Sequence, residues 1–393
     1  MSLFSASESR ATAPLIESAA AMRSTCPDLS ELVTIVVSPR ERHYSTLPSL
    51  KSLFATIPAE VRVIVVQGDV PSDLGGRLRE LRAQRSFELV EMPFPLYPNE
   101  ARNLGLAECR TEFVVLADND INYEPGWLDA LVRQAQTEGA DLVAPLIFIG
   151  PPCAQIIHHA GGRIRTYRDE NGDIAVREYH QLMDQPFAAV DINGLGTGNE
   201  VVEFHCFLGR SAYLNRCGPL EERFITAEQI DFGMRAFCLS GLVTFAGDSH
   251  VTYVAKEPFH ESDLEYLAFR WNDDQAIESL RTFASIWNIE IDSAERLNHW
   301  IRPHRARAYG TLFRDEYETL PRKTFRERIA SPLEERALER ADSLRGSRQL
   351  TQARLIDSRE RDAAIHHFWI DLPPDPSDPQ PLSVRGPVPR IHE

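Results

Sequence analysis

Apolar runs alternate with segments of helical apolar spacing through about the first third of the chain. Runs of β-branched and other apolar residues predict buried strands at residues 32–37, 61–66, 86–90 and 112–117. Apolar residues at helical intervals predict helices at residues 45–54, 74–82 and 101–109. Short connections between such elements are typical of a mostly parallel sheet with helices on both faces, so we expect an α/β fold.

The pattern changes after residue 145. Residues 150–210 indicate strands and loops with several glycines and histidines, and residues 220–240 predict one strong helix. Beyond residue 266 the chain is helical and rich in arginine, and its last residues are rich in proline. We therefore expect a loosely ordered lead-in at residues 1–30 and an α/β domain at residues 31–265, with halves at 31–145 and 146–265. A helical extension at residues 266–369 and a proline-rich tail at residues 370–393 follow.

Polar side chains follow three of the predicted strands. Ser38, Gln67 and Asp118 each come directly after a strand. In a parallel sheet the ligand lies in a crevice beyond the carboxyl ends of the strands. We therefore expect these three distant positions to converge on one crevice.

Two carboxylates separated by one residue end the last of these strands. Asp118 and Asp120 flank Asn119 directly after an apolar run. Burying two neighbouring carboxylates is unfavourable unless a cation or hydrogen-bond donors compensate for their charge. Mg²⁺ and Mn²⁺ take oxygen ligands from one or two carboxylates together with substrate phosphates. The position at a strand end favours such a metal site over a solvated turn or a helix cap.

Composition and charge narrow the classes of function. Apolar residues make up 43% of the 393 residues and charged residues 25%, as in ordinary globular proteins. The net charge of −16 argues against a nucleic acid as the main partner. The six cysteines form no CxxC pair and indicate reduced thiols. Without an apolar run of membrane-spanning length or a signal-peptide pattern, we expect a cytoplasmic protein with no transmembrane segment.

Several short motifs follow one another between residues 32 and 253. They lie at residues 101–107, 112–120, 125–128, 156–162, 218–224 and 227–235. Each motif is weak alone, but their order and spacing together resemble family 2 glycosyltransferases with the GT-A fold. The resemblance implies an enzyme that uses Mn²⁺ or Mg²⁺ and moves a sugar from a nucleotide diphosphate sugar, of UDP or GDP type, to a hydroxyl of a glycan, lipid or small-molecule acceptor.

The same resemblance implies roles for individual residues on the donor side. It implies that Asp118 faces the ribose and the metal, that Asp120 binds the metal, and that Arg102 and Asn103 contact the donor. Ser38 lies at the first strand end of the same crevice. The aspartate that commonly reads the nucleobase is replaced by Gln67, with Asp69 two residues later, so the base of the donor stays open.

The acceptor side departs from the family pattern at Gln229. This residue stands where inverting members place the aspartate that deprotonates the acceptor, and an amide cannot accept that proton. Three alternatives remain: Glu228 or Asp231 acts as the base, the enzyme retains anomeric configuration without a base, or catalysis is lost and the chain is a nucleotide-sugar-binding scaffold. We favour a working enzyme with Glu228 or Asp231 as base.

The family histidine that often binds the metal is also missing, since Val254 stands at its position. His250 and His260 flank that position, and either could supply an imidazole ligand. Glu203 and His205 point the same way on a predicted strand, and we favour a structural role for this histidine over a ligand.

Two further hypotheses concern a different activity and the extension. A sugar nucleotidyltransferase shares a similar core, but residues 38–42 lack the glycines of its phosphate loop, so this alternative ranks low. Basic residues outnumber acidic ones at residues 295–362. This region could make a peripheral contact with a membrane or an anionic acceptor, although a solvated helical face is the favoured interpretation.

Overall fold

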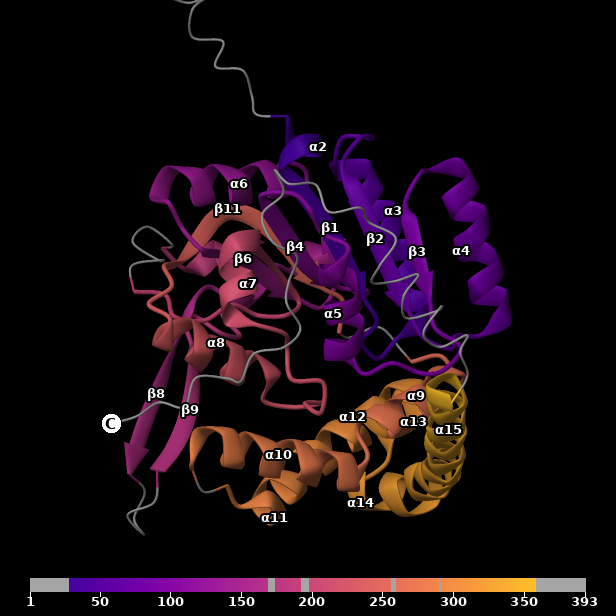
Figure 1. The fold of residues 1–393 in the computed structure, drawn as a ribbon. Helices are drawn as coiled ribbons and strands as arrows, with labels where there is room; N and C mark the ends of the chain where they lie inside the picture. Colours follow the sequence, from indigo (N-terminus) through magenta and orange to yellow (C-terminus); the bar gives the residue numbers. More distant parts are fainter. Residues whose placement is uncertain (1–27, 169–173, 192–197, 256–258, 290, 358–393) are drawn as a thin grey trace, which may run out of the picture.

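The computed structural model describes residues 28–168, 174–191, 198–255, 259–289 and 291–357 (Figure 1). Most of the predicted lead-in and the whole predicted proline-rich tail lie outside these residues. Within them, no helix is long and apolar enough to cross a membrane.

A nine-stranded sheet forms the centre of the described chain. Its order is β3-β2-β1-β4-β10-β6-β11-β5, with β7 paired to β6. The strands are β1 (Val33–Ser38), β2 (Arg62–Gln67), β3 (Glu88–Glu91), β4 (Phe113–Asp118), β5 (Ile121–Tyr123), β6 (Leu142–Ile149), β7 (Ile156–His159), β10 (Cys206–Arg210) and β11 (Val243–Tyr253). Strands β1 to β4 pair in parallel, as do β6 and β11, whereas β5, β7 and β10 are antiparallel to their neighbours. The predicted α/β fold with a mostly parallel sheet is confirmed.

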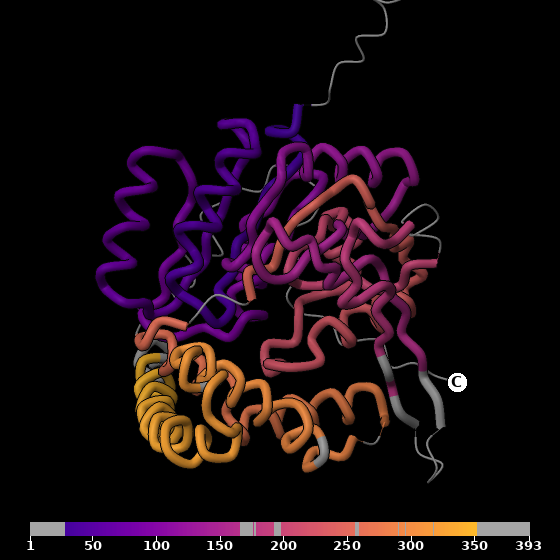
Figure 2. Tube along the Cα trace, turned by 180° about the vertical axis from the view of Figure 1, so that it is seen from behind, coloured from indigo at the N-terminus to yellow at the C-terminus, as the bar shows by residue number. Residues whose placement is uncertain are grey.

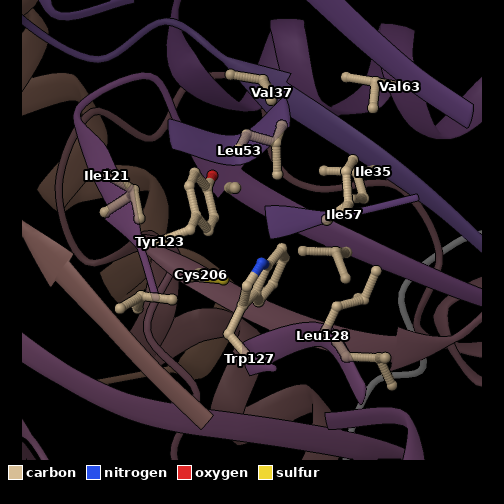
Figure 3. Packing of buried hydrophobic residues seen from close by; sticks show 14 of the residues in the cluster. Ile35, Val37, Leu53, Ile57, Val63, Ile121, Tyr123, Trp127, Leu128 and Cys206 are labelled. Carbon is tan, nitrogen blue, oxygen red and sulfur yellow. The ribbon is translucent and has the colours of Figure 1, made fainter. Parts of the chain in front are cut away.

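Helices cover both faces of this sheet (Figure 1). They are α2 (Leu29–Leu32), α3 (Thr46–Thr56), α4 (Ser72–Gln84), α5 (Pro98–Ala107), α6 (Trp127–Glu138), α7 (Ser211–Cys217) and α8 (Glu228–Cys238). Alternate side chains of β1 enter two cores: Ile35 and Val37 pack with α3, α4 and α6, and Val36 packs with α5, α7 and α8. Figure 3 shows part of the first core, where Trp127 lies among aliphatic side chains. Burial on both faces explains why these strands are continuously apolar.

The second half of the domain departs from the strand–helix alternation of the first half, and the predicted bounds of one helix were wrong. Strand β10 inserts between β4 and β6 and runs antiparallel to both. The predicted single helix at 220–240 begins only at Glu228, because Ala227 adopts a left-handed conformation with φ of 63° and residues 218–226 form a loop. A separate hairpin, β8 (Gly162–Arg168) with β9 (Ile174–His180), projects from the domain (Figure 1).

The arginine-rich part after residue 262 forms a helical layer along one end of the α/β domain (Figures 1 and 2). Its helices are α9 (Asp263–Arg270), α10 (Asp273–Trp287), α11 (Ser293–Arg296), α12 (Arg302–Leu312), α13 (Arg314–Thr319), α14 (Arg322–Phe325) and α15 (Ser331–Asp357), with π-helical turns at Leu297–Ile301 and Arg326–Ala330. An apolar cluster joins this layer to Tyr97 and Ile225 of the α/β domain. Several of its arginines form ion pairs within the chain, among them Arg305 with Glu334 and Arg348 with Glu100.

Candidate functional site

The carboxyl ends of β1 and β4 meet the amino end of β10. Ser38 lies opposite Asp118 in the parallel register of β1 and β4. The backbone N–H of Asp118 donates to the carbonyl of His205, the residue before β10, at 3.0 Å. The predicted convergence of Ser38 and Asp118 is therefore observed, and the antiparallel strand adds His205 to it.

Asp118 is fully buried and surrounded by positive groups. Its Oδ2 atom lies 2.6 Å from Arg40 Nη1 and 3.2 Å from His205 Nδ1, and its Oδ1 atom lies 2.8 Å from Arg102 Nη2. Burial alone would raise the pKa of this carboxyl, but Arg40 and Arg102 outweigh burial and hold the pKa well below its ordinary value. Asp118 is thus a fixed anion.

Asp120 is equally buried but has no such partners. Among the described residues neither of its carboxylate oxygens has a hydrogen-bond partner, and Arg42 Nη1 lies 3.7 Å from Oδ2. Burial raises the pKa of Asp120 to about 6, against the attraction of Arg40. Ligand atoms of Asp118, Asp120 and His205 all lie within 4.8 Å of one another. A buried carboxylate without donors, beside a second carboxylate and an imidazole, fits a divalent cation.

The segment after β1 is tied to the carboxylates through Asn119. The Asn119 side chain accepts from the backbone N–H of Arg40 and donates to the carbonyl of Arg42 and to Thr46 Oγ1. These contacts bring both arginines over the strand ends. The sequence analysis missed Arg40 and Arg42 as site residues, although charged residues directly after a buried strand were a usable signal.

The donor residues suggested by the resemblance fall into two groups. Arg102 on α5 is fully buried, contacts Asp118 and lies over the Phe204 ring. Asn103, its neighbour, instead donates to the carbonyl of Leu220 and to Glu222. Asn103 thus holds the loop before α8 and is not brought to the strand-end carboxylates by any described contact.

Gln67 and Asp69 lie at the end of β2. Gln67 is buried, and its side-chain amide donates to Glu91 at 2.9 Å. Asp69 is exposed, and its backbone N–H donates to the Phe94 carbonyl. Gly68 between them has no room for a Cβ, which would lie 2.5 Å from the carbonyl oxygen of Phe94. The roles of Gln67 and Asp69 toward a base stay predictions.

The three candidate acceptor-side residues lie in the first turn of α8 and differ in their contacts. Both carboxylate oxygens of Asp231 are engaged: one pairs with Arg235, and the other accepts from Trp287 Nε1 at 2.9 Å. Gln229 donates to Glu178 at 3.3 Å. Glu228 lies 3.4 Å from Arg270 Nη2 and is the least constrained of the three.

Arg270 brings the helical extension into the site. It is almost fully buried and contacts both Glu228 and Glu41, the latter at 3.3 Å. Burial lowers the pKa of Arg102, and the charges of Asp118 and Glu228 both oppose this effect. The charges of the two carboxylates therefore act on the same guanidinium, which couples the α8 end of the site to the strand ends electrostatically.

Neither of the histidines predicted as metal ligands joins the strand-end carboxylates in the described residues. His250 lies 3.4 Å from Glu124 and packs on Phe148. His260 bonds to Ser262 and stacks on Tyr44. The imidazole near the carboxylates is that of His205, for which the sequence favoured a structural role.

Comparison with known proteins identifies the region that holds these carboxylates. Residues 36–189 match the family model described as glycosyl transferase family 2. The match covers 154 of the 393 residues. The "Pre-mycofactocin glycosyltransferase" of Mycobacterium tuberculosis is 38% identical over 65 residues, which are 16% of this chain and 14% of that protein. The chain thus matches only a small part of its curated relative.

Solved structures of low sequence identity also resemble the chain. The S. aureus TarS 1–349 structure gives a TM-score of 0.40 at 15% identity and covers 80% of each chain. The structure of GalNAc-T7 with UDP, GalNAc and Mn²⁺ gives 0.45 at 12% identity, covering 78% of this chain and 57% of that one.

The family 2 region contains only part of the site. Arg102, Asp118 and Asp120 lie inside residues 36–189, whereas Glu228 and Arg270 lie beyond them. The family match therefore covers the strand-end carboxylates. The opposite wall of the site, which is formed by Glu228 and Arg270, is interpreted from its own contacts.

Proposed function

We propose that this chain is a metal-dependent glycosyltransferase. It would move a sugar from a nucleotide diphosphate sugar, of UDP or GDP type, to a hydroxyl of a glycan, lipid or small-molecule acceptor. The single observation that carries this proposal is the unequal pair of buried carboxylates at the end of β4. Asp118 is neutralised by two arginines, while Asp120 lacks any hydrogen-bond donor among the described residues.

The metal would be Mn²⁺ or Mg²⁺, with Asp120 as its principal protein ligand. His205 and Asp118 each place a potential ligand atom within 4.8 Å of Asp120, so either could also contact the ion. When bound, such an ion neutralises the charge that develops on the diphosphate leaving group. The cytoplasmic location expected from the sequence agrees with the supply of nucleotide sugars and remains part of the proposal.

Asp118 would position the donor. Because Arg40 and Arg102 keep its carboxylate ionised and fixed, it can accept hydrogen bonds from ribose hydroxyls without moving. Positioning of this kind contributes to the rate because the reacting groups are already oriented before the transfer step.

Glu228 is the acceptor-side base that the contacts favour. Both oxygens of Asp231 are held by Arg235 and Trp287, so that carboxylate is a structural group of α8. Glu228 touches only the side chain of Arg270 among the recorded polar contacts of the described residues. One of its Oε atoms would take the proton of the attacking hydroxyl, which gives inversion at the anomeric carbon.

The test is donor turnover with and without the Asp120 carboxylate. We expect Asp120→Ala to abolish Mn²⁺-dependent release of nucleoside diphosphate from a panel of nucleotide sugars, with the fold checked by circular dichroism. His250→Gln is a matched control on β11 and should keep wild-type turnover. Wild-type turnover by Asp120→Ala in the presence of Mn²⁺ would refute the metal role.

Gln229 supports a second candidate, a nucleotide-sugar-binding protein without transferase activity. Its amide stands at the family's base position and is hydrogen-bonded to Glu178. Calorimetry of UDP with Mn²⁺, run beside turnover on a broad acceptor panel, separates the two. Binding without turnover favours the binding protein, and turnover that depends on Glu228 favours the enzyme.

A further inference from the structure

A second group of potential metal ligands lies beside the strand-end carboxylates. His159 ends β7, His180 ends β9, and Glu203 lies shortly before β10, so three distant segments contribute to it. One ligand atom from each residue lies within 4.8 Å of the others. We call these three residues the Glu203 cluster.

Two of the three distances inside the cluster are close to the separation of ligand atoms around a tetrahedral ion. His159 Nδ1 lies 3.3 Å from His180 Nδ1, and His180 Nδ1 lies 3.6 Å from Glu203 Oε1. A tetrahedral Zn²⁺ with bonds of about 2.0–2.1 Å separates its ligand atoms by roughly 3.4 Å. The contact between the two histidines is within hydrogen-bond range, whereas the distance from His180 to Glu203 is too long for a good hydrogen bond.

Glu203 is a buried carboxylate that is surrounded by imidazoles. It is 5% exposed, and every ion pair recorded for it within the described residues is to a histidine. No lysine or arginine of the described chain pairs with it. Histidines alone thus face the charge of this buried carboxylate, and a bound cation would compensate for it further.

The surroundings of His180 resemble the outer shell of a metal site. Its second ring nitrogen, Nε2, lies 3.6 Å from Glu178 Oε1, an oxygen that has no hydrogen-bond partner in the described residues. The other oxygen of Glu178 accepts from Gln229 Nε2. Histidines that bind metals usually direct their other nitrogen to a carboxylate or carbonyl, which orients the ring. An aspartate at position 229 would repel Glu178, whereas the amide of Gln229 holds it.

We propose that His159, His180 and Glu203 bind a transition-metal ion of the Zn²⁺ class, at a site separate from that of Asp118 and Asp120. Two imidazoles and one carboxylate are a ligand set that suits Zn²⁺ better than Mg²⁺ or Ca²⁺, which prefer oxygen ligands. Three protein ligands leave a fourth position for water or substrate.

His205 lies between the two sites and connects them. Its Nε2 atom is 3.5 Å from Glu203 Oε2, and its Nδ1 atom is 3.2 Å from Asp118 Oδ2. In this arrangement Gln229 is a positioning residue that acts on the ion through Glu178 and His180. This role gives a reason for the amide at position 229 that does not require loss of catalysis.

The experiment measures bound zinc directly. The full chain, purified without a polyhistidine tag, is stripped with a chelator and dialysed against micromolar Zn²⁺, and its zinc is measured by mass spectrometry. Visible absorption after Co²⁺ loading reports nitrogen–oxygen coordination. We expect about one ion per chain in the wild type and in Asp120→Asn, which lacks the donor-side carboxylate. His159→Gln and His180→Gln should weaken binding by at least about 100-fold, and Glu178→Gln by about 10–100-fold.

Controls keep this proposal independent of the transferase activity. His250→Gln removes a histidine elsewhere on the sheet and should bind zinc like the wild type. Stabilisation by UDP or GDP with Mn²⁺ is measured on the His159, His180, Glu178 and His250 variants, which keep both strand-end carboxylates, and circular dichroism verifies the fold of Asp120→Asn. Absence of zinc from the wild type, or its loss in Asp120→Asn alone, would overturn the proposal. Retention of zinc in both His159→Gln and His180→Gln would also overturn it, because the ion would then be held elsewhere, for example by His158, Glu203 and His205.

Discussion

Asp120→Asn should stabilise the metal-free protein. Asp120 is fully buried, neither oxygen has a hydrogen-bond partner in the described chain, and its pKa is raised from 3.8 to about 6. A rise of one pKa unit corresponds to about 1.4 kcal/mol, so the ionised carboxylate lowers the free energy of unfolding by about 3 kcal/mol at neutral pH. The neutral, equally sized amide removes that cost.

The pH dependence of this effect has a defined sign. Because the pKa of Asp120 is higher in the folded state than in the unfolded chain, the cost is absent below about pH 4. It grows as the pH rises toward 6 and is complete above that value. The gain from Asp120→Asn should therefore be largest at pH 8 and vanish near pH 4.

Asp118→Asn is the matched control at the same strand end, and it should have the opposite sign. Removing this charge leaves Arg40 and Arg102 without their carboxylate, which should lower the free energy of unfolding by about 3–5 kcal/mol. Urea unfolding of both variants in a chelator at pH 8 measures the two effects. Loss of stability in Asp120→Asn under these conditions would refute the view that burial of the Asp120 charge outweighs its attraction to Arg40 and Arg42.

Two further predictions concern the opposite wall of the site. Glu228→Gln should lower kcat for sugar transfer by about 10²–10⁴-fold, while Arg270 keeps its pair with Glu41. Asp231→Asn should mainly lower the urea midpoint because Arg235 loses its partner. Equal loss of kcat in both variants, measured by nucleoside diphosphate release, contradicts the assignment. Arg270→Ala leaves Glu41 and Glu228 buried without their guanidinium and should cost about 3–5 kcal/mol in urea unfolding. An unchanged midpoint would show that this contact carries no stability.

The carboxylates at the end of β4 could be located from the sequence because their signals are local. A buried apolar run followed by Asp118 and Asp120 identifies both the strand and the polar groups at its end. The parallel register then places Ser38 opposite Asp118. Periodicity and strand-end chemistry were sufficient for this placement, and the binding roles of these residues stay predictions.

The histidines could not be predicted because their positions depend on a long-range strand pairing. His205 reaches Asp118 only because β10 inserts antiparallel between β4 and β6. No local pattern distinguishes that topology from a further parallel strand. The start of α8 was also missed, because its first turn follows a left-handed Ala227 that propensity does not reveal.

Calorimetry of UDP and GDP with Mn²⁺, on the wild type and on Asp120→Ala, tests the central claim most directly. The proposed function predicts that one of the two nucleotides binds the wild type in a manner that requires Mn²⁺, and that Asp120→Ala, with its fold verified, loses this binding. Equal Mn²⁺-dependent binding by both proteins, or no binding of either nucleotide by the wild type, would contradict it.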